Sequence, residues 1–337
     1  MDSLANRLRL ARSYVARRSL CDGMPVDFSI ELTSRCNLKC VMCPRDDDSA
    51  RGLGNMKLAT FQRIMDDAAQ YLEFAHLHLA GEPLMHPDFA SFIDYAAKVG
   101  VRTEISTNGT MLDEARGQVL IDSQLTNLII SIDGTDAETY QKIRGADSFA
   151  KVVRNAEQFL RQKRAAGRGP HTIVQMICMN ENASQNKEFA QRWQELGADA
   201  VRLKRYFNFA GHVEDRGYDQ PEQPPRRQPC YLLWRQLAFY YDGTAVSCCH
   251  DFLHQSELGN IHTQSLAEIW NSPVMVAMRE KHIAGKQAEI ALCAGCNQPQ
   301  VSLPQVLGTA VLNGATAKRA LVALERMTRL LGVKSPY

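Results

Sequence analysis

The stretch Glu31-Leu-Thr-Ser-Arg-Cys36-Asn-Leu-Lys-Cys40-Val-Met-Cys43-Pro44 decides how this chain is organised. It places three cysteines at the spacing C-x3-C-x2-C, directly after an alternating run that is typical of a β-strand. Three thiolates on one loop can bind three irons of a 4Fe-4S cluster and leave the fourth iron open to a small molecule. Zinc, or three structural thiols, would be the alternative interpretation. Zinc usually takes a fourth Cys or His from nearby, and the first histidine after the loop is His76.

Length and composition set the broad class of the chain. The 337 residues carry a net charge of +2 and are 45% hydrophobic, values that are ordinary for a globular protein. The length predicts two domains, or one barrel with an appendage. The charge gives no reason to expect nucleic acid as a partner. No apolar run reaches the ~18 residues of a membrane span, and no signal peptide is evident. We therefore expect a cytoplasmic protein, whose grouped cysteines indicate metal ligands rather than disulfides.

From residue 26 to residue 210, strand and helix patterns alternate, which predicts an α/β fold with a parallel sheet. The expected strands lie near residues 27–33, 74–80, 101–107, 127–132, 171–178 and 199–205. The expected helices lie near residues 58–72, 87–99, 113–122, 136–143, 148–166 and 184–196. Parallel barrels bind ligands at the C-terminal ends of their strands, so the functional motifs should gather there.

The three-cysteine loop after the first strand resembles that of the radical S-adenosylmethionine (radical SAM) superfamily. The resemblance implies a partial (β/α)6 barrel over residues 26–210, with SAM chelating the open iron. It also implies a reductant such as flavodoxin or ferredoxin. Later motifs occur in the order expected of that superfamily. Ala80-Gly81-Glu82-Pro83 resembles its G-G-E-P motif, in which the backbone and the glutamate hold the SAM amino group, although Ala80 replaces the first glycine.

The resemblance also implies a set of contacts to SAM. Arg144 matches an arginine that pairs with the SAM carboxylate, which suits a guanidinium, although a surface ion pair would also explain it. Met42 stands where the superfamily usually has an aromatic residue beside the adenine. Gln175 interrupts an apolar strand and is expected to face the pocket. The expected cofactor-binding residues are Met42, Gly81, Glu82, Pro83, Thr107, Asn108, Ser131, Asp133, Arg144 and Gln175.

Polar side chains alternate with apolar ones along the sixth predicted strand. Arg202, Lys204 and Tyr206 are separated by single apolar or charged residues. On the inner face of a barrel they would point towards substrate, and we expect them to guide a proton there. The alternative is a strand end whose charges simply reach water.

A second set of cysteines follows a Pro- and Gly-containing linker at residues 211–229. Residues 230–300 resemble the SPASM auxiliary-cluster module in its shortened "twitch" form, with L-G-N-I and E-I-W phrases and a closing C-x2-C. The resemblance implies one auxiliary 4Fe-4S cluster. Cys249 is expected to be the spare cysteine, although a swap with Cys248 stays open, and a zinc ribbon would fit the same spacing. The expected ligands are Cys230, Cys248, Cys293 and Cys296.

Both ends of the chain are basic. Residues 1–25 predict a helix with an apolar stripe of Leu4, Leu8, Leu10, Ala11 and Val15. Residues 301–337 predict a basic amphipathic helix over 313–332, with Leu321, Leu324, Met327 and Leu331 on one side. Packing on the core is the expected role of both helices. Peripheral contact with a membrane surface is the alternative.

Together these features predict a two-cluster radical SAM oxidoreductase. The resemblance implies that one electron cleaves SAM to a 5′-deoxyadenosyl radical, which abstracts a substrate hydrogen, after which an electron passes to the auxiliary cluster. About 25 residues precede the first strand, too few for a peptide-recognition domain, which favours a small polar metabolite such as a sugar or aminocyclitol. The alternatives are a maturase that modifies a peptide or protein, or a non-catalytic iron-sulfur or zinc protein.

Overall fold

The computed structural model describes residues 3–45, 52–217, 228–298 and 301–311. Nine strands form one sheet in the order β6-β5-β4-β3-β2-β1-β7-β8-β9. The first six strands are parallel to their neighbours, as the α/β pattern predicts. They are β1 (Asp27–Ile30), β2 (Phe74–His76), β3 (Arg102–Thr107), β4 (Asn127–Ser131), β5 (His171–Cys178) and β6 (Ala200–Arg205).

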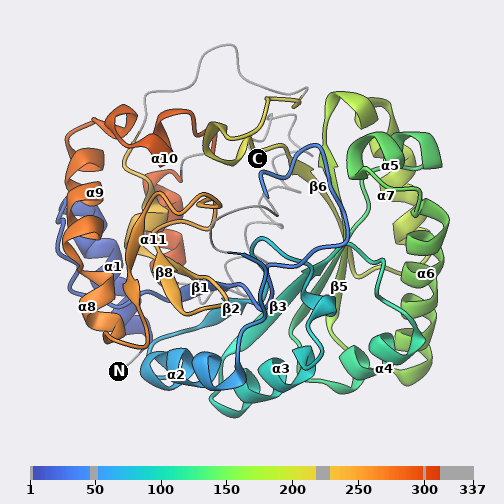
Figure 1. Cartoon of the computed structure of the whole chain (residues 1–337), viewed down its shortest axis with the longest axis horizontal. Coiled ribbons are helices and arrows are strands. Elements are labelled where there is room, and N and C mark those ends of the chain that lie inside the picture. Colours follow the sequence, from blue (N-terminus) through green and yellow to red (C-terminus); the bar gives the residue numbers. More distant parts are fainter. Residues whose placement is uncertain (1–2, 46–51, 218–227, 299–300, 312–337) are drawn as a thin grey trace.

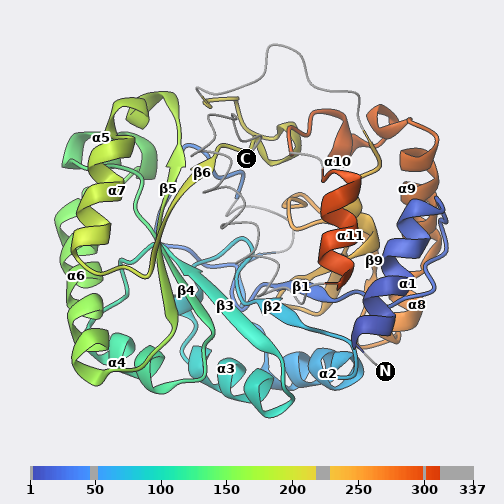
Figure 2. The ribbon, with the colours of Figure 1, turned by 180° about the vertical axis from the view of Figure 1, so that it is seen from behind.

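Helices between these strands cover the outer face of the curved sheet, which confirms the partial (β/α)6 barrel (Figures 1 and 2). They are α2 (Leu58–Ala68), α3 (Phe89–Lys98), α4 (Glu114–Asp122), α5 (Ala137–Arg144), α6 (Phe149–Ala166) and α7 (Asn186–Glu195). Local signals fix their ends. Asp113 and Asp136 cap α4 and α5 by accepting backbone N–H bonds, and Gly167 ends α6 in the left-handed conformation that favours glycine.

The two faces of the barrel sheet differ in polarity. Outward residues such as Phe28, Ile105 and Ile130 are fully buried against the helices in the main hydrophobic core. Successive side chains of a strand point to opposite faces, so the residues that alternate with these line the inside of the barrel. The inner set contains Ile129, Ile173 and Ile177 but also many polar residues, which include Ser29, Glu104, Ser106, Asn127, Ser131, Gln175, Arg202 and Lys204. The interior of the barrel therefore offers many hydrogen-bonding and charged groups.

The C-terminal part extends the same sheet. β7 (Gln236–Phe239) pairs in parallel with β1, and β8 (Thr244–Val246) and β9 (Glu257–Asn260) follow antiparallel. A hairpin turn at Asp242-Gly243 joins β7 to β8. The β1–β7 pairing was not predicted, and it ties the second cysteine group to the barrel. The remaining helices here are α8 (Leu266–Trp270), α9 (Pro273–Ile283) and α10 (Ala291–Ala294).

Five short 3-10 helices complete the described segments. They are η1 (Pro83–Met85), η2 (Asn180–Gln185), η3 (Phe209–Gly211), η4 (Tyr231–Trp234) and η5 (Gln287–Glu289).

The N-terminal helix packs on the molecule rather than standing apart. In α1 (Ser3–Val15), Leu10 and Ala11 are buried, and the buried Arg7 pairs with Glu73. Leu4, Leu8 and Val15 are 41–49% exposed, so the predicted apolar stripe does not lie on one buried face. Within the described residues, none of the helices combines the length and apolarity needed to cross a bilayer.

A helix at the end of the described chain, α11 (Leu303–Val311), lies beside α1. Arg7 Nε donates to the carbonyl of Ala310 at 3.0 Å, which joins the two helices. The helix predicted over 313–332, with Leu321, Leu324, Met327 and Leu331, lies outside the described residues.

Candidate functional site

The three-cysteine loop leaves the C-terminal end of β1 and is fixed at both ends. Glu31 N donates to Phe239 O at 2.9 Å, and Val41 N donates to Ile143 O at 2.9 Å. Arg45 Nη2 donates to the carbonyl of Leu38 at 3.1 Å, which folds the loop back on itself. The loop is therefore built between β7 on one side and α5 on the other.

The thiols of this loop suit an iron-sulfur cluster. Cys36, Cys40 and Cys43 are half-buried, and all three are free. Burial raises the pKa of Cys36, and it raises the pKa of Cys43 to about 11. These two thiols would thus release protons when they bind a metal. Their three sulfur atoms do not all lie within 4.8 Å of one another, whereas a tetrahedral zinc with ~2.3 Å bonds needs sulfurs about 3.8 Å apart. The spacing favours the larger cluster.

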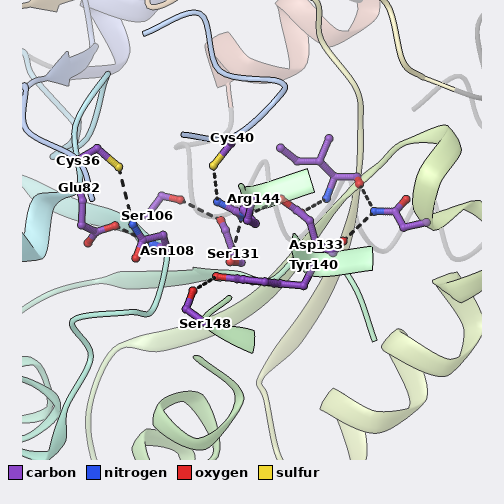
Figure 3. Close-up of polar contacts among 12 residues, drawn as sticks. Cys36, Cys40, Glu82, Ser106, Asn108, Ser131, Asp133, Tyr140, Arg144 and Ser148 are labelled. Carbon is purple, nitrogen blue, oxygen red and sulfur yellow. Dashed lines mark hydrogen bonds and ion pairs between the residues drawn. The ribbon is translucent and has the colours of Figure 1, made fainter. Parts of the chain in front are cut away.

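Two side chains direct N–H groups at the sulfurs. Asn108 Nδ2 lies 3.8 Å from Cys36 Sγ, and Arg144 Nη1 lies 3.8 Å from Cys40 Sγ (Figure 3). Donors of this kind stabilise sulfur that carries negative charge. Asn108 comes from the end of β3 and Arg144 from the end of α5, so the loop meets two other motifs of the predicted SAM site.

The Gly81-Glu82-Pro83 turn packs directly against the cluster loop. A Cβ at Gly81 would come within 1.9 Å of the Thr33 carbonyl oxygen, so only glycine allows this approach. Glu82 N donates to Arg35 O at 2.8 Å. Pro83 then begins η1 and is buried. The departure from the superfamily motif, Ala80, is also buried and leaves this arrangement intact.

The Glu82 carboxylate is buried and joins the turns after β2 and β3. It accepts from Thr107 Oγ1 at 2.7 Å and from Asn108 N at 2.7 Å. Burial raises the pKa of Glu82, and these hydrogen bonds oppose that rise. In the structure, Thr107 and Glu82 therefore hold the turn that presents Asn108 to the cluster loop. Their contact with SAM stays a prediction.

Arg144 is held by the end of β4. Its Nε lies 2.8 Å from Asp133 Oδ2, and its Nη2 donates to Ser131 O at 3.0 Å. Burial alone would lower the pKa of Arg144, but Asp133 raises it above its usual value. The surface ion pair considered for Arg144 is wrong, since both Asp133 and Arg144 are buried. Ser131 Oγ faces Ser106 Oγ at 3.4 Å inside the barrel.

The inner face of the sheet continues from Ser131 to Gln175 and Arg202. The register pairs Ser131 with Gln175 and Gln175 with Arg202, and Arg202 Nη1 donates to Gln175 Oε1 at 3.3 Å. Lys204 follows on the same face. Gln175 thus lies on the polar interior, next to the strand that carries the two predicted basic residues.

Tyr206 and Met42 lie in a small separate core. Both are buried, and they pack with Ile143 and Met179. The hydroxyl of Tyr206 donates to Glu214 O at 2.6 Å, and burial raises the pKa of Tyr206 to about 12. β6 ends at Arg205, so the alternation that placed Tyr206 with Lys204 does not extend to it. A role of Tyr206 in proton transfer stays a prediction.

A cavity of about 90 Å³ lies beside the N-terminal end of β7. We call it the second cavity because it contains the second group of cysteines. Its lining includes all four cysteines predicted to bind the auxiliary cluster, together with His250 and His282. These cysteines are half-buried and form no disulfide with another described residue, and burial raises the pKa of Cys230 to about 11. No three of them lie within 4.8 Å of one another, which again is wider than one zinc ion requires. The cysteines are Cys230, Cys248, Cys293 and Cys296.

Cys249 is placed differently from Cys248. It does not line this cavity, and it lies against Cys248, His250 and the inward-facing Gln236, contacts that hold the pKa of Cys249 below its usual range. On the opposite wall, His282 Nδ1 accepts from Cys230 N at 3.1 Å. A neutral His282 ring therefore carries its proton on Nε2, which lies 3.4 Å from Cys293 Sγ.

One cluster of functional groups was not found from the sequence. His76, His78 and Glu104 lie inside the barrel with one ligand atom each within 4.8 Å of the others. His76 Nδ1 is 3.0 Å from Glu104 Oε1, and burial lowers the pKa of His78 to about 4. The alternation of His76 and His78 on the second predicted strand was the available signal, but Glu104 enters only through the β2–β3 register.

Comparison with known families agrees with this geometry. The profile of the radical SAM superfamily matches residues 30–201, which is half of the chain. This chain belongs to the radical SAM superfamily. A second profile, the iron-sulfur cluster-binding domain SPASM, matches residues 230–297 of this radical SAM protein. The cofactors of this chain are therefore SAM, a 4Fe-4S cluster in the radical SAM region, and auxiliary iron-sulfur binding in the SPASM region.

Two curated relatives match much of the radical SAM chain. The antilisterial bacteriocin subtilosin biosynthesis protein AlbA of Bacillus subtilis is 25% identical, over 75% of this chain and 61% of its own length. The mycofactocin maturase MftC of Mycobacterium ulcerans is 32% identical, over 70% of this chain and 60% of its own length. The matches therefore span about three fifths of these relatives.

Solved structures share the fold. SuiB of Streptococcus suis, bound to the precursor peptide SuiA, has a TM-score of 0.65 at 14% identity, covering 89% of this radical SAM chain and 76% of SuiB. BtrN, in complex with AdoMet and 2-DOIA, has a TM-score of 0.56 at 20% identity, covering 82% of this chain and 94% of BtrN.

Proposed function

We propose that this chain is a radical SAM enzyme that oxidises a peptide or protein substrate, with an auxiliary cluster in its SPASM region as electron acceptor. The names of the relatives support a peptide substrate, because AlbA is a bacteriocin biosynthesis protein and MftC is a maturase. SuiB, which shares the fold, is seen with a precursor peptide. The names of AlbA and MftC do not support the small polar metabolite that the short N-terminal region favoured.

The observation that carries the proposal is the placement of the two cysteine sites around one polar interior. The first site follows β1, and the second flanks β7, its neighbour in the sheet. A chain of contacts leads from the interior to the second cavity. Lys204 Nζ lies 5.3 Å from the centre of the Phe207 ring. The centre of that ring lies 6.0 Å from the centre of the His250 ring, and His250 lines the second cavity. A substrate in the barrel would thus lie between the two sites.

When bound, the first cluster and SAM supply a carbon radical that removes a hydrogen atom from the substrate, and the second cluster accepts an electron. The residues of the chain hold and orient these groups. Cys36, Cys40 and Cys43 leave room for a fourth, non-protein ligand. Arg144, fixed by Asp133, presents its remaining N–H groups beside Cys40, where a carboxylate of SAM would be bound.

The substrate loses two electrons and two hydrogens overall. One hydrogen would leave as an atom and the other as a proton, and an auxiliary cluster held by Cys230, Cys248, Cys293 and Cys296 would take up the remaining electron. Lys204 is the residue on the inner face that we propose to guide the departing proton. It contacts Phe207, which lies between Lys204 and the second cavity.

Incubation of the anaerobically reconstituted protein with SAM, dithionite and candidate substrates tests the proposal. The candidates are peptides encoded by genes next to that of this chain, with sugars and aminocyclitols as the comparison set. We expect one peptide to lose two hydrogens in mass while 5′-deoxyadenosine forms in equal amount. Oxidation of a sugar or aminocyclitol with every peptide unchanged would overturn the peptide assignment and support the second candidate.

That second candidate is oxidation of a small polar metabolite. The polarity of the barrel interior favours it, because Ser106, Ser131 and Gln175 offer hydrogen bonds suited to hydroxyl groups. BtrN, which shares the fold, was solved with 2-DOIA. Bound iron without any cleavage of SAM would support the non-catalytic alternative instead.

A further inference from the structure

The inner face of β6 presents two positive side chains, Arg202 and Lys204. They lie two residues apart, and their strand neighbours on β5 are Gln175 and Ile177. Because Gln175 also pairs with Ser131, all of these residues share the polar interior. Both basic side chains are half-buried. Both side chains therefore lie on the inner face of the barrel and are partly screened from bulk water.

Neither side chain has an acidic partner among the residues that the structure describes. Two other half-buried cations do have one, since Arg235 pairs with Asp27 and Lys163 pairs with Asp199. A carboxylate within 4.0 Å is found for neither Arg202 nor Lys204 in the described ranges. Two adjacent cations in a partly enclosed site cost free energy unless an anion joins them.

The nearby carboxylates are already engaged. Glu104 and Asp133 both act on the charge of Lys204, but Glu104 Oε1 is 3.0 Å from His76, and its Oε2 accepts from Asn127 at 3.0 Å. Asp133 is paired with Arg144 at 2.8 Å. Neither carboxylate therefore forms an ion pair with Arg202 or Lys204, although Cys249, Glu104 and Asp133 all offset the positive charge of Lys204 at longer range.

The surroundings leave donors available for a ligand. Among the described residues, the Arg202 guanidinium makes one hydrogen bond, to Gln175 Oε1 at 3.3 Å, and a guanidinium has five N–H donors. Lys204 lies against the face of Phe207 at 5.3 Å, which holds the ammonium group without neutralising it. A planar fork beside a point charge is a suitable arrangement for a carboxylate.

We propose that Arg202 and Lys204 form a subsite that binds a carboxylate of the substrate. The subsite is separate from Arg144, which lies beside Cys40 and is assigned to SAM. Resting on the proposed function, the inference narrows the substrate to a peptide with an Asp or Glu side chain, or a terminal carboxylate, close to the oxidised carbon. Without such a group, the two cations would oppose substrate binding.

Chemical protection of Lys204 tests the subsite directly. The holoprotein is acetylated briefly with N-acetoxysuccinimide, and modification of each lysine is measured by mass spectrometry with and without succinate. We expect succinate to lower modification of Lys204 by about fivefold, as for ~80% occupancy. Its neutral diamide should have no effect, and the exposed Lys187 serves as the internal control.

Three results would overturn the subsite. Lys204 could resist acetylation even without succinate, which would show that the interior does not admit a small ligand. Succinate and its diamide could act equally, or inorganic phosphate could protect better than succinate, which would remove the carboxylate assignment. In Arg202→Gln, protection by succinate should fall to the level of the diamide, whereas Lys187→Gln should leave it unchanged.

A peptide array separates this inference from the proposed function. Arrayed peptides that differ only in Asp against Asn, or Glu against Gln, are incubated with the holoprotein and with Arg202→Glu/Lys204→Glu. We expect the wild type to retain acidic members and the reversed variant to retain Lys- or Arg-containing ones. Succinate protection without any peptide binding would contradict the peptide substrate and leave the subsite standing. Peptide binding that ignores charge would overturn the subsite alone.

Discussion

Arg144 Nε lies 2.8 Å from Asp133 Oδ2, and both side chains are buried beside Cys40. The pair joins the end of β4 to the end of α5, and it fixes a guanidinium at the edge of the cluster loop (Figure 3). Asp133 Oδ1 also accepts from Ile177 N at 2.7 Å, which ties β5 into the same unit. Asp133 is therefore a positioning residue for Arg144.

Replacing Asp133 with Asn should weaken SAM binding. The change keeps the size of the side chain but removes the charge that orients Arg144, and a charge-assisted hydrogen bond is worth about 1.5–3 kcal/mol. We expect Kd for SAM to rise by about 10-fold or more in the reconstituted protein, measured by calorimetry under anaerobic conditions. Asp242→Asn, at an exposed turn, is the control. Equal affinity in the Asp133 and Asp242 variants would contradict the positioning role.

Gly81→Ala should disturb the cluster loop. The added Cβ would meet the carbonyl oxygen of Thr33 at 1.9 Å and that of Arg35 at 2.8 Å, so backbone must move on one side. We expect the first cluster to assemble poorly, with about half of the iron lost per chain. Gly308→Ala is the matched control, because open space surrounds that position. Full iron content in Gly81→Ala would show that the close approach is not needed.

Cys248 and Cys249 should behave differently when each is changed to Ala. Cys248 lines the second cavity, whereas Cys249 lies outside its lining and contacts Gln236. We expect the iron content of Cys248→Ala to be about four per chain instead of about eight, whereas Cys249→Ala should retain both clusters. Iron and sulfide analysis after anaerobic reconstitution measures this. The reverse pattern would exchange the two cysteines in the ligand set.

His282 should raise the reduction potential of the auxiliary cluster. Its Nε2 lies 3.4 Å from Cys293 Sγ, and Cys230 N fixes the opposite ring nitrogen as an acceptor. A hydrogen bond to sulfur favours the more negative, reduced state. We expect His282→Leu to lower the potential by roughly 20–60 mV, since about 1.4 kcal/mol corresponds to ~59 mV for one electron.

A redox titration followed by electron paramagnetic resonance measures the potential of that cluster. The exposed His262→Leu should leave it unchanged. An unchanged potential in His282→Leu, with iron content intact, would show that the ring only fills space.

Local sequence patterns predicted the barrel well. The strands and helices from β1 to α7 follow alternating and helical periodicities. Several helices begin or end at a residue suited to capping, such as Asp113 and Asp136 at helix N-termini and Gly167 at a helix C-terminus. The cluster loop could be predicted because its three cysteines lie within eight residues. Such signals are local in the sequence, so they can be recognised without knowledge of the fold.

Long-range pairings could not be read in the same way. The β1–β7 pairing joins strands about 200 residues apart, and nothing in either short strand indicates which strand it pairs with. The cluster of His76, His78 and Glu104 depends on register between two strands. Tyr206 was placed on the inner face by alternation, but the strand ends one residue earlier and the ring turns into the core with Met42.

The central claim is that the cysteine loop after β1 cleaves SAM and that the second cavity serves a separate cluster. Formation of 5′-deoxyadenosine from SAM and dithionite by the reconstituted chain tests it most directly. We predict that the wild type and Cys293→Ala both form it, whereas the variant with Cys36, Cys40 and Cys43 changed to Ala forms none. Formation by that triple variant at the wild-type rate, or none by a wild type that holds about eight irons, would contradict the claim.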